Sequence, residues 1–469
     1  MKECSTSGRR IDSLPYLLRF SGRTNWLRVL QKRKARGLTS MIIRALLLIA
    51  FVSIPAIAQQ SSQSSKALTL QDCIQMAESA PSEVLIARQE REIADRDVVQ
   101  ARAGFLPQSQ ILSGFIYNSP SLNDPTTFSF LPLNAIREYL LLGEVRQEVD
   151  TSGRLRAEFA RARANQDASR AVFEIARRDL RRAVSLAYYR LLLARRLAAV
   201  ITDALAESRN FEQRTRLLVE NGEAARADLV KASAQVASSQ QALNTAETEA
   251  TLANQELASF WKQDVNELLI IADVLDDPLP ALEPDPAAGN PAPFLRRPEF
   301  NLFDANRRGF EADARVARSA LLPQLSFVFQ YGFDATSVSI RNRGYAAFIN
   351  LSIPVFDWFK ARSRAQQSKL RAQQMETRRA IAERQFSRDY QNAIARVKKL
   401  FEQTSLTREQ VRLAEEDLRL SRIRYEGGEG SALDVVTAQN QLAQARSNYY
   451  TAMASYLNAR ADLEVASGR

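Results

Sequence analysis

The residue types that could carry chemistry are scarce in this chain of 469 residues. It contains no histidine, and its two cysteines are Cys4 and Cys73. Histidine is the commonest general base and the commonest zinc ligand, so its absence removes both roles. The sequence also lacks a glycine-rich phosphate loop, and its carboxylates are scattered along predicted helices in the manner of solvated charges. We therefore expect no catalytic activity, no cofactor and no metal site.

Two aspartates stand out because each follows a glycine turn in a matching sequence context, 206 residues apart. An acid in the first turn of a helix stabilises the helix dipole, and a serine just before it can cap the helix. Both aspartates can therefore act as helix caps at the start of a helix that follows an exposed turn. The matching residues are Gly222, Glu223 and Asp228 in the first copy, and Gly428, Glu429, Ser431 and Asp434 in the second.

The matching turns belong to a larger internal repeat. Residues 101–108 resemble residues 317–324, and each segment contains a leucine-proline pair, Leu106-Pro107 or Leu322-Pro323. Two separated matches in the same order, with nearly equal offsets, predict a tandem duplication of 68–261 and 298–466. Residues 262–297 lie between the copies, contain six prolines, and are predicted to form a linker with a short strand at 268–271.

Each copy is predicted to contain a very long helix, at 153–220 and at 359–426. Neither segment contains a proline, and 68 residues of helix span about 100 Å. A helix of this length needs neighbours along its whole length, as in a coiled coil. Shorter helices at 82–104 and 299–321 are predicted to stop at Pro107 and Pro323, because proline cannot continue a helix. Return helices are predicted at 226–261 and 431–466.

Between the short and the long helix of each copy, apolar residues alternate with polar ones. Every second residue is aromatic in one of these segments, which contains Phe327, Phe329, Tyr331 and Phe333. Similar alternation occurs in 345–355 and, less regularly, in 111–117 and 139–149. Segments of this length with an apolar face rimmed by aromatic residues are typical of transmembrane β-strands. Half-buried strands of a soluble sandwich are the alternative, which four strands among long helices do not favour.

The start of the sequence predicts export. Residues 45–54 form a short apolar run that follows Arg44 and is followed by Ala56-Ile57-Ala58, as in a secretory signal peptide. We expect residues 1–58 to be a basic leader plus signal peptide, with 41–58 as the signal proper and 1–40 either a real extension or the product of an early start codon. The net charge of +11 is concentrated in this leader. The remaining chain is nearly neutral, which gives no electrostatic reason to expect nucleic acid.

An exported chain with barrel-like strands, long helices and a duplicated layout resembles the TolC-type outer-membrane efflux proteins, and the resemblance covers residues 68–466. It rests on the two leucine-proline pairs, on the strand end at 353–357 and on the hairpin motif that runs from Tyr425 to Val435. The first copy departs from this pattern, with Gln147 in place of a proline and Ala225 in place of a serine.

The resemblance implies an α+β membrane protein that forms a homotrimer. Four strands per chain would build a 12-stranded transmembrane β-barrel, continued by a long α-helical coiled-coil barrel in the periplasm. Counting strands points the same way, because four cannot close a barrel and eight would leave no conduit. The aromatic strand would face outer-membrane lipid.

By the same resemblance, the protein would be the exit duct of a tripartite efflux or type I secretion system. The glycine turns would meet a periplasmic adaptor protein and, through it, an inner-membrane pump. Asp228 and Asp434 would constrict the lumen or only cap helices, and Thr437 occupies one acidic position of the family constriction. A periplasmic adaptor and a structural coiled-coil envelope protein are the alternative functions. The sequence does not indicate the cargo.

Overall fold

The computed structural model describes residues 67–120, 135–275 and 292–468. The described residues all belong to one compact unit, 65–469. The predicted leader and signal peptide lie outside the described residues, as do most of the prolines of the predicted linker.

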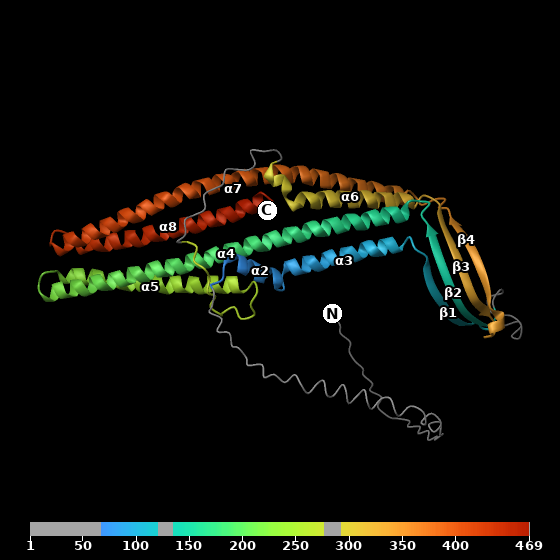
Figure 1. Cartoon of the computed structure of the whole chain (residues 1–469), viewed down its shortest axis with the longest axis horizontal. Coiled ribbons are helices and arrows are strands. Elements are labelled where there is room, and N and C mark those ends of the chain that lie inside the picture. The colour runs from blue at the N-terminus through green and yellow to red at the C-terminus, as the bar shows by residue number, and fades with distance from the viewer. Residues whose placement is uncertain (1–66, 121–134, 276–291, 469) are drawn as a thin grey trace, which may run out of the picture. The chain divides into compact units, whose positions relative to one another are not determined.

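Helices make up most of the described chain. The two long ones, α4 (Arg154–Glu220) and α7 (Lys360–Glu426), have 67 residues each, which confirms the predicted bounds to within one residue. The same order of elements follows in both halves (Figure 1). The other helices are α2 (Leu70–Ser79), α3 (Glu83–Ala103), α5 (Arg226–Ala258), α6 (Pro298–Ser319), α8 (Ala432–Ala466) and the 3₁₀ helices η2 (Pro293–Arg296) and η3 (Ile340–Asn342).

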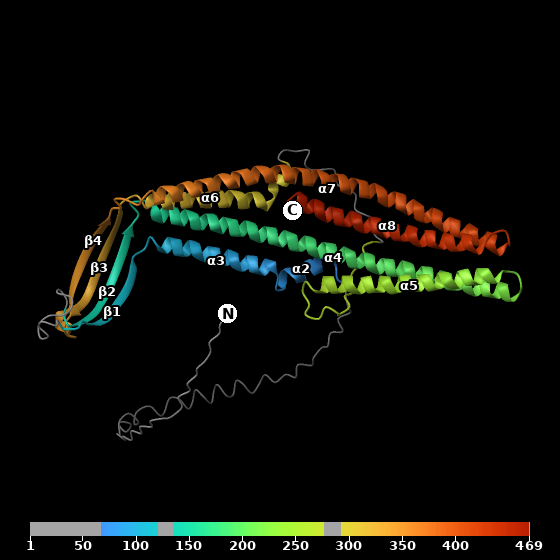
Figure 2. The ribbon, with the colours of Figure 1, turned by 180° about the vertical axis from the view of Figure 1, so that it is seen from behind.

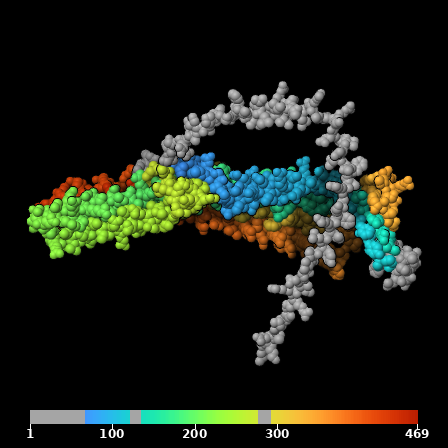
Figure 3. All heavy atoms as spheres, turned by 90° about the horizontal axis from the view of Figure 1, so that it is seen from below, coloured from blue at the N-terminus to red at the C-terminus, as the bar shows by residue number. Residues whose placement is uncertain are grey.

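The helices of this unit lie side by side along its length, with the sheet at one end and both hairpin turns at the other (Figures 1 and 2). In the half next to the sheet, the packing order is α3, α4, α6, α7. In the half next to the turns, it is α5, α4, α8, α7. The layer therefore has two edges, one formed by α3 and α5 and the other by α7. Figure 3 shows α3 and α5 following one another along the first edge.

Four antiparallel strands form one sheet in the order β1-β2-β3-β4. They are β1 (Gln108–Tyr117), β2 (Arg137–Val149), β3 (Gln324–Ala335) and β4 (Gly344–Ser352). Phe329 lies opposite Val145 on β2 and Ala347 on β4. This register places the predicted apolar positions of all four strands on one face, because cross-strand partners point the same way. Strands β1 and β4 have an unpaired edge within the described chain.

The junctions between helix and strand follow the predicted prolines. Pro107 and Pro323 immediately precede β1 and β3, and the helices before them end at Ala103 and Ser319. At the other end of the strand pairs, the carboxylates of Asp150 and Asp357 accept hydrogen bonds from backbone N–H groups in the first turns of α4 and α7, respectively. β4 ends two residues before Pro354, which has no N–H to donate to a sheet.

The main apolar core lies in the middle of the layer, between the half next to the sheet and the half next to the hairpin turns. It contains Tyr188 of α4 and Tyr456 of α8, both fully buried. The Tyr188 hydroxyl donates to the carbonyl of Ala272 at 2.7 Å. The segment around Ala272 belongs to the predicted linker, yet Leu269 and Leu275 are buried in this core. Instead of a short strand at 268–271, a single parallel bridge joins Ile271 to Leu68.

Candidate functional sites at the hairpin tips and on the sheet

The hairpin tips, residues 221–225 and 427–431, have the same backbone geometry. Gly222 and Gly428 adopt left-handed φ values of +79° and +75°. After each glycine, the next N–H reaches back into the preceding helix, from Glu223 to the Leu218 carbonyl at 2.8 Å and from Glu429 to the Arg424 carbonyl at 2.9 Å. A Cβ on either glycine would contact nothing within 4 Å. Glycine is therefore required here by the backbone and not by crowding.

The two aspartates after the tips differ in their contacts. Ser431 and Asp434 form a reciprocal capping box, in which the Ser431 N–H donates to Asp434 at 3.0 Å and the Asp434 N–H donates to the Ser431 hydroxyl at 3.2 Å. Hydrogen bonds from the Ser431 backbone and hydroxyl hold the pKa of Asp434 below its usual value. In the first copy Ala225 provides no side-chain cap, and Asp228 lies 3.5 Å from the Lys231 ammonium.

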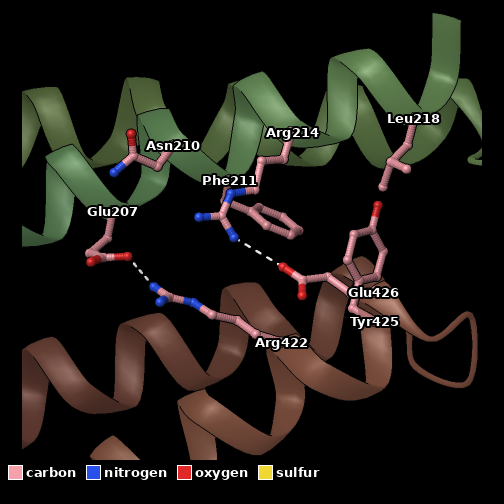
Figure 4. A pocket seen from close by; sticks show the side chains of 8 residues that line it. All are labelled: Glu207, Asn210, Phe211, Arg214, Leu218, Arg422, Tyr425 and Glu426. Atoms are coloured by element: carbon pink, nitrogen blue, oxygen red, sulfur yellow. Dashed lines mark hydrogen bonds and ion pairs between the residues drawn. The ribbon is translucent and has the colours of Figure 1, made fainter.

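Behind the tips, two ion pairs join the first half of the chain to the second. Arg422 of α7 pairs with Glu207 of α4, and Arg214 of α4 pairs with Glu426 of α7 at 3.0 Å (Figure 4). The charges alternate, so that each helix supplies one arginine and one glutamate. Partners about 200 residues apart give no local sequence signal, which is why sequence reasoning missed all four residues.

An apolar cluster supports the same contact between halves. The Phe211 ring of α4 lies 5.3 Å from the Tyr425 ring of α7, beside the Arg214–Glu426 pair (Figure 4). Phe211 belongs to the same apolar cluster as Val435, which is fully buried. Tyr425 was part of the predicted hairpin motif, and its partner Phe211 was not identified from the sequence.

The two faces of the sheet have opposite character. Phe327, Phe329 and Tyr331 are 43%, 46% and 51% exposed, and Phe333 on the same face is half-buried. On the other face, Glu144 accepts hydrogen bonds from Gln110 at 3.0 Å and from Gln330 at 2.7 Å. These three polar residues come from β1, β2 and β3 and form a row across the sheet. An aromatic face opposite a face with a polar row is typical of a sheet between an apolar and an aqueous environment.

Among the described residues, no helix combines the length and the apolar character that crossing a membrane requires.

Two long helical hairpins that carry a small antiparallel sheet, aromatic on one face and polar on the other, define the class of protein. The chain belongs to the outer membrane efflux protein family, whose model matches residues 73–261 and 294–469. This match confirms the family resemblance expected from the hairpin and leucine-proline motifs.

Individual relatives agree with this assignment. The chain is 27% identical over 227 residues to the pyoverdine export outer membrane protein OpmQ of Pseudomonas aeruginosa, a match that covers 45% of this chain and 48% of the relative. It is 29% identical over 192 residues to OpmQ of Pseudomonas putida, with 39% of each chain covered. The chain thus spans about half the length, or less, of the curated relatives it matches.

Solved structures share the fold over most of the chain. The outer membrane channel CmeC of Campylobacter jejuni superposes with a TM-score of 0.75 at 17% identity and covers 85% of each chain. The open state of the outer membrane channel MtrE of Neisseria gonorrhoeae superposes with a TM-score of 0.73 at 21% identity, covering 85% of this chain and 88% of that one. At these identities the likeness concerns the fold.

Proposed function

We propose that the protein is the outer-membrane exit duct of a tripartite efflux or type I secretion system, extending from the outer membrane into the periplasm. The observation that carries the proposal is the two-faced sheet at the end of helices about 100 Å long. Its aromatic face contacts outer-membrane lipid, and its polar row of Gln110, Glu144 and Gln330 faces an aqueous pore.

Closure of the barrel requires further copies of the chain. An open sheet edge in lipid leaves backbone groups unpaired at a cost of several kcal/mol each. The free edge of β1 in one copy therefore pairs with the free edge of β4 in the next. Four strands per chain give eight in a dimer and twelve in a trimer, and an eight-stranded barrel is filled by its own side chains. The smallest assembly with a conduit is the homotrimer.

The surface of α7 supports a neighbouring copy along the helices as well. One side of α7 is buried within the chain, and the opposite side carries exposed bulky residues at helical spacing. These exposed residues are Leu370, Ile381, Leu406, Leu413 and Leu420. A helix with apolar stripes on opposite sides is suited to a neighbour on each side, because apolar stripes mark packing surfaces.

The other edge of the layer offers a complementary surface. On α3, Ile86 and Ile93 are 49% and 61% exposed. On α5, the exposed side runs from Val230 to Leu252 and consists mainly of small or polar residues between these two. Bulky residues of α7 would pack against this smoother surface in the next copy, and the proposed pairing of β1 with β4 of that copy would bring the same two edges together.

The hairpin tips are proposed to contact the periplasmic adaptor, and through it the inner-membrane pump. They lie at the end of the helices opposite the sheet, and their glycines expose backbone without side-chain cover (Figure 1). Asp228 and Asp434 lie in the helix turns just after the tips, where three copies could bring six carboxylates around the tunnel axis.

Membrane fractionation combined with planar-bilayer recording tests the proposal. We expect the processed protein in the outer-membrane fraction, beginning near Gln59, and single-channel conductance after reconstitution. Recovery of an unprocessed protein in the cytosol, or of a purified oligomer that never conducts, would overturn the proposal.

A further inference from the structure

The arginines of the two long helices have different surroundings: α4 lies inside the helical layer, and α7 forms one of its edges. In α4, ten of the twelve arginines between Arg154 and Arg196 form ion pairs. In α7, the segment from Lys360 to Lys399 contains twelve lysines and arginines but only three acids. Only Arg379 and two others of these twelve form an ion pair within the described part of the chain. The α7 charges are therefore not used to hold the fold together.

These unpaired charges occupy both polar sides of α7. The helix has a buried side and, opposite to it, the exposed apolar stripe described above. If each of these two sides meets a neighbouring helix, the two remaining sides face the tunnel and the periplasm. One of them carries Arg362, Lys369, Arg384 and Lys398, and the other carries Arg364, Arg371, Arg378 and Arg396. All eight residues are exposed.

Whichever of these two sides faces inward, α7 presents basic residues to the tunnel. The excess of basic over acidic residues is confined to the half of α7 next to the sheet. Residues 400–429, next to the tip, contain seven acids and five basic residues. In the proposed assembly α7 lies next to α3 of the adjacent copy, which is close to neutral, with five acids and four arginines, and would not offset the charge of α7.

We propose that the half of the tunnel next to the membrane is lined by the unpaired basic residues of α7 and that the duct conducts anionic cargo, such as small molecules carrying carboxylate, sulfate or phosphate groups. This inference rests on the proposed channel function. In a homotrimer each basic side is present three times around the axis. A channel with walls of one sign concentrates ions of the opposite sign and excludes like charges.

Cysteine labelling measures the potential on each side of α7 separately. Gln373→Cys and Gln374→Cys place a thiol beside the first and the second basic side, respectively, because residues three or four apart share a helix face. The native Cys73 gives little background, since it is fully buried and its pKa is raised to about 11 by burial and by Asp72. The variants are purified as trimers and treated with anionic and cationic methanethiosulfonates of similar size.

The tunnel-facing cysteine is identified in a planar bilayer as the one whose modification lowers the conductance. At that position, with each rate divided by the rate of the same reagent with a free thiol in solution, we expect the anionic reagent to react several-fold faster at low salt, because a potential of about one kT changes the ratio of the two normalised rates by about sevenfold. The ratio should approach one in 1 M salt, where the Debye length is about 3 Å.

Matched charge variants complete the test. The preference for the anionic reagent at Gln374→Cys should disappear when Arg371→Gln and Arg378→Gln are added. At Gln373→Cys it should disappear when Lys369→Gln and Arg384→Gln are added. These side chains form no ion pair in the described structure, so trimer assembly should persist. Equal rates or a faster cationic reagent at the tunnel-facing position would overturn the inference, as would a conducting channel that neither modification affects. A protein that does not conduct at all would instead overturn the proposed function.

Discussion

At the hairpin tips the two halves of the chain use one backbone turn with different side-chain caps. Gly222 and Gly428 have nearly the same φ, whereas only the second tip has a capping box, formed by Ser431 and Asp434. The capping contacts favour the structural role for Asp434 that the sequence left open, and a role in the lumen stays a prediction. The second tip is held more firmly at its return helix than the first.

Replacement of Gly428 by valine should abolish efflux while leaving membrane insertion and the oligomer intact. A β-branched side chain at φ +75° is strained by about 1–2 kcal/mol, which would distort the surface that we propose contacts the adaptor. Gly428→Asn is the control, because asparagine tolerates this conformation better than other side chains. Efflux assays and native gels measure the two effects, and normal efflux by the valine variant would contradict the proposed role of the tip.

Cys73 should resist alkylation in the folded protein. Burial and the charge of Asp72 raise its pKa to about 11, so that about one thiol in a thousand is ionised at pH 8. Because this pKa is raised in the folded state, deprotonation favours unfolding, and stability should fall as the pH rises above the ordinary thiol value of about 9. Labelling with iodoacetamide with and without denaturant measures this difference, and rapid labelling of the folded protein would contradict the buried position.

At the scale of elements, sequence patterns located the long helices to within a residue and all four strands to within a few residues. Proline, glycine and alternation are local signals, so they mark where elements end. The separate helix α2 and the packing of Leu269 and Leu275 were not predicted, because they depend on contacts with distant helices. The Glu207–Arg422 pair was missed for the same reason. The tandem duplication stays a prediction, although the order of elements is the same in both halves.

The two faces of β3 should respond differently to charge. Phe329→Arg places a cation on the exposed aromatic face, which would cost about 2–4 kcal/mol in the middle of a membrane and lower the yield of assembled protein. Gln330→Arg points to the polar face, where Glu144 can pair with the new cation. Outer-membrane yield and heat stability of the oligomer compare the variants, and equal tolerance of both would show that the strand does not face lipid.

A photo-cross-linker at Glu429 should capture an adaptor protein during active transport. Glu429 is exposed at the second tip, directly after the left-handed glycine. A cross-linker at Tyr345, exposed on the sheet at the opposite end of the helices, serves as the control and should capture no adaptor. The proposed tip contact fails if the two positions behave alike.

At the scale of the whole molecule, a single chain leaves surfaces uncovered that a neighbouring copy could cover. Its sheet has two free edges, and the edges of its helical layer carry exposed apolar residues on α3 and α7 that nothing in the described chain covers. A closed ring of identical chains resolves both features at once, because each copy covers the edges of the next. The sequence alone supplied the strand count that selects three copies, and the structure adds the surfaces on which the copies would meet.

The number of chains in the detergent-extracted protein tests this account most directly. Native mass spectrometry should give three copies, and Leu413→Glu, which places a charge in the exposed stripe of α7, should reduce the trimer more than the same change at an exposed polar position on another side of the helix, such as Ser405→Glu. The account predicts a homotrimer that conducts. A monomer or a closed dimer would contradict both the twelve-stranded barrel and the duct that it supports.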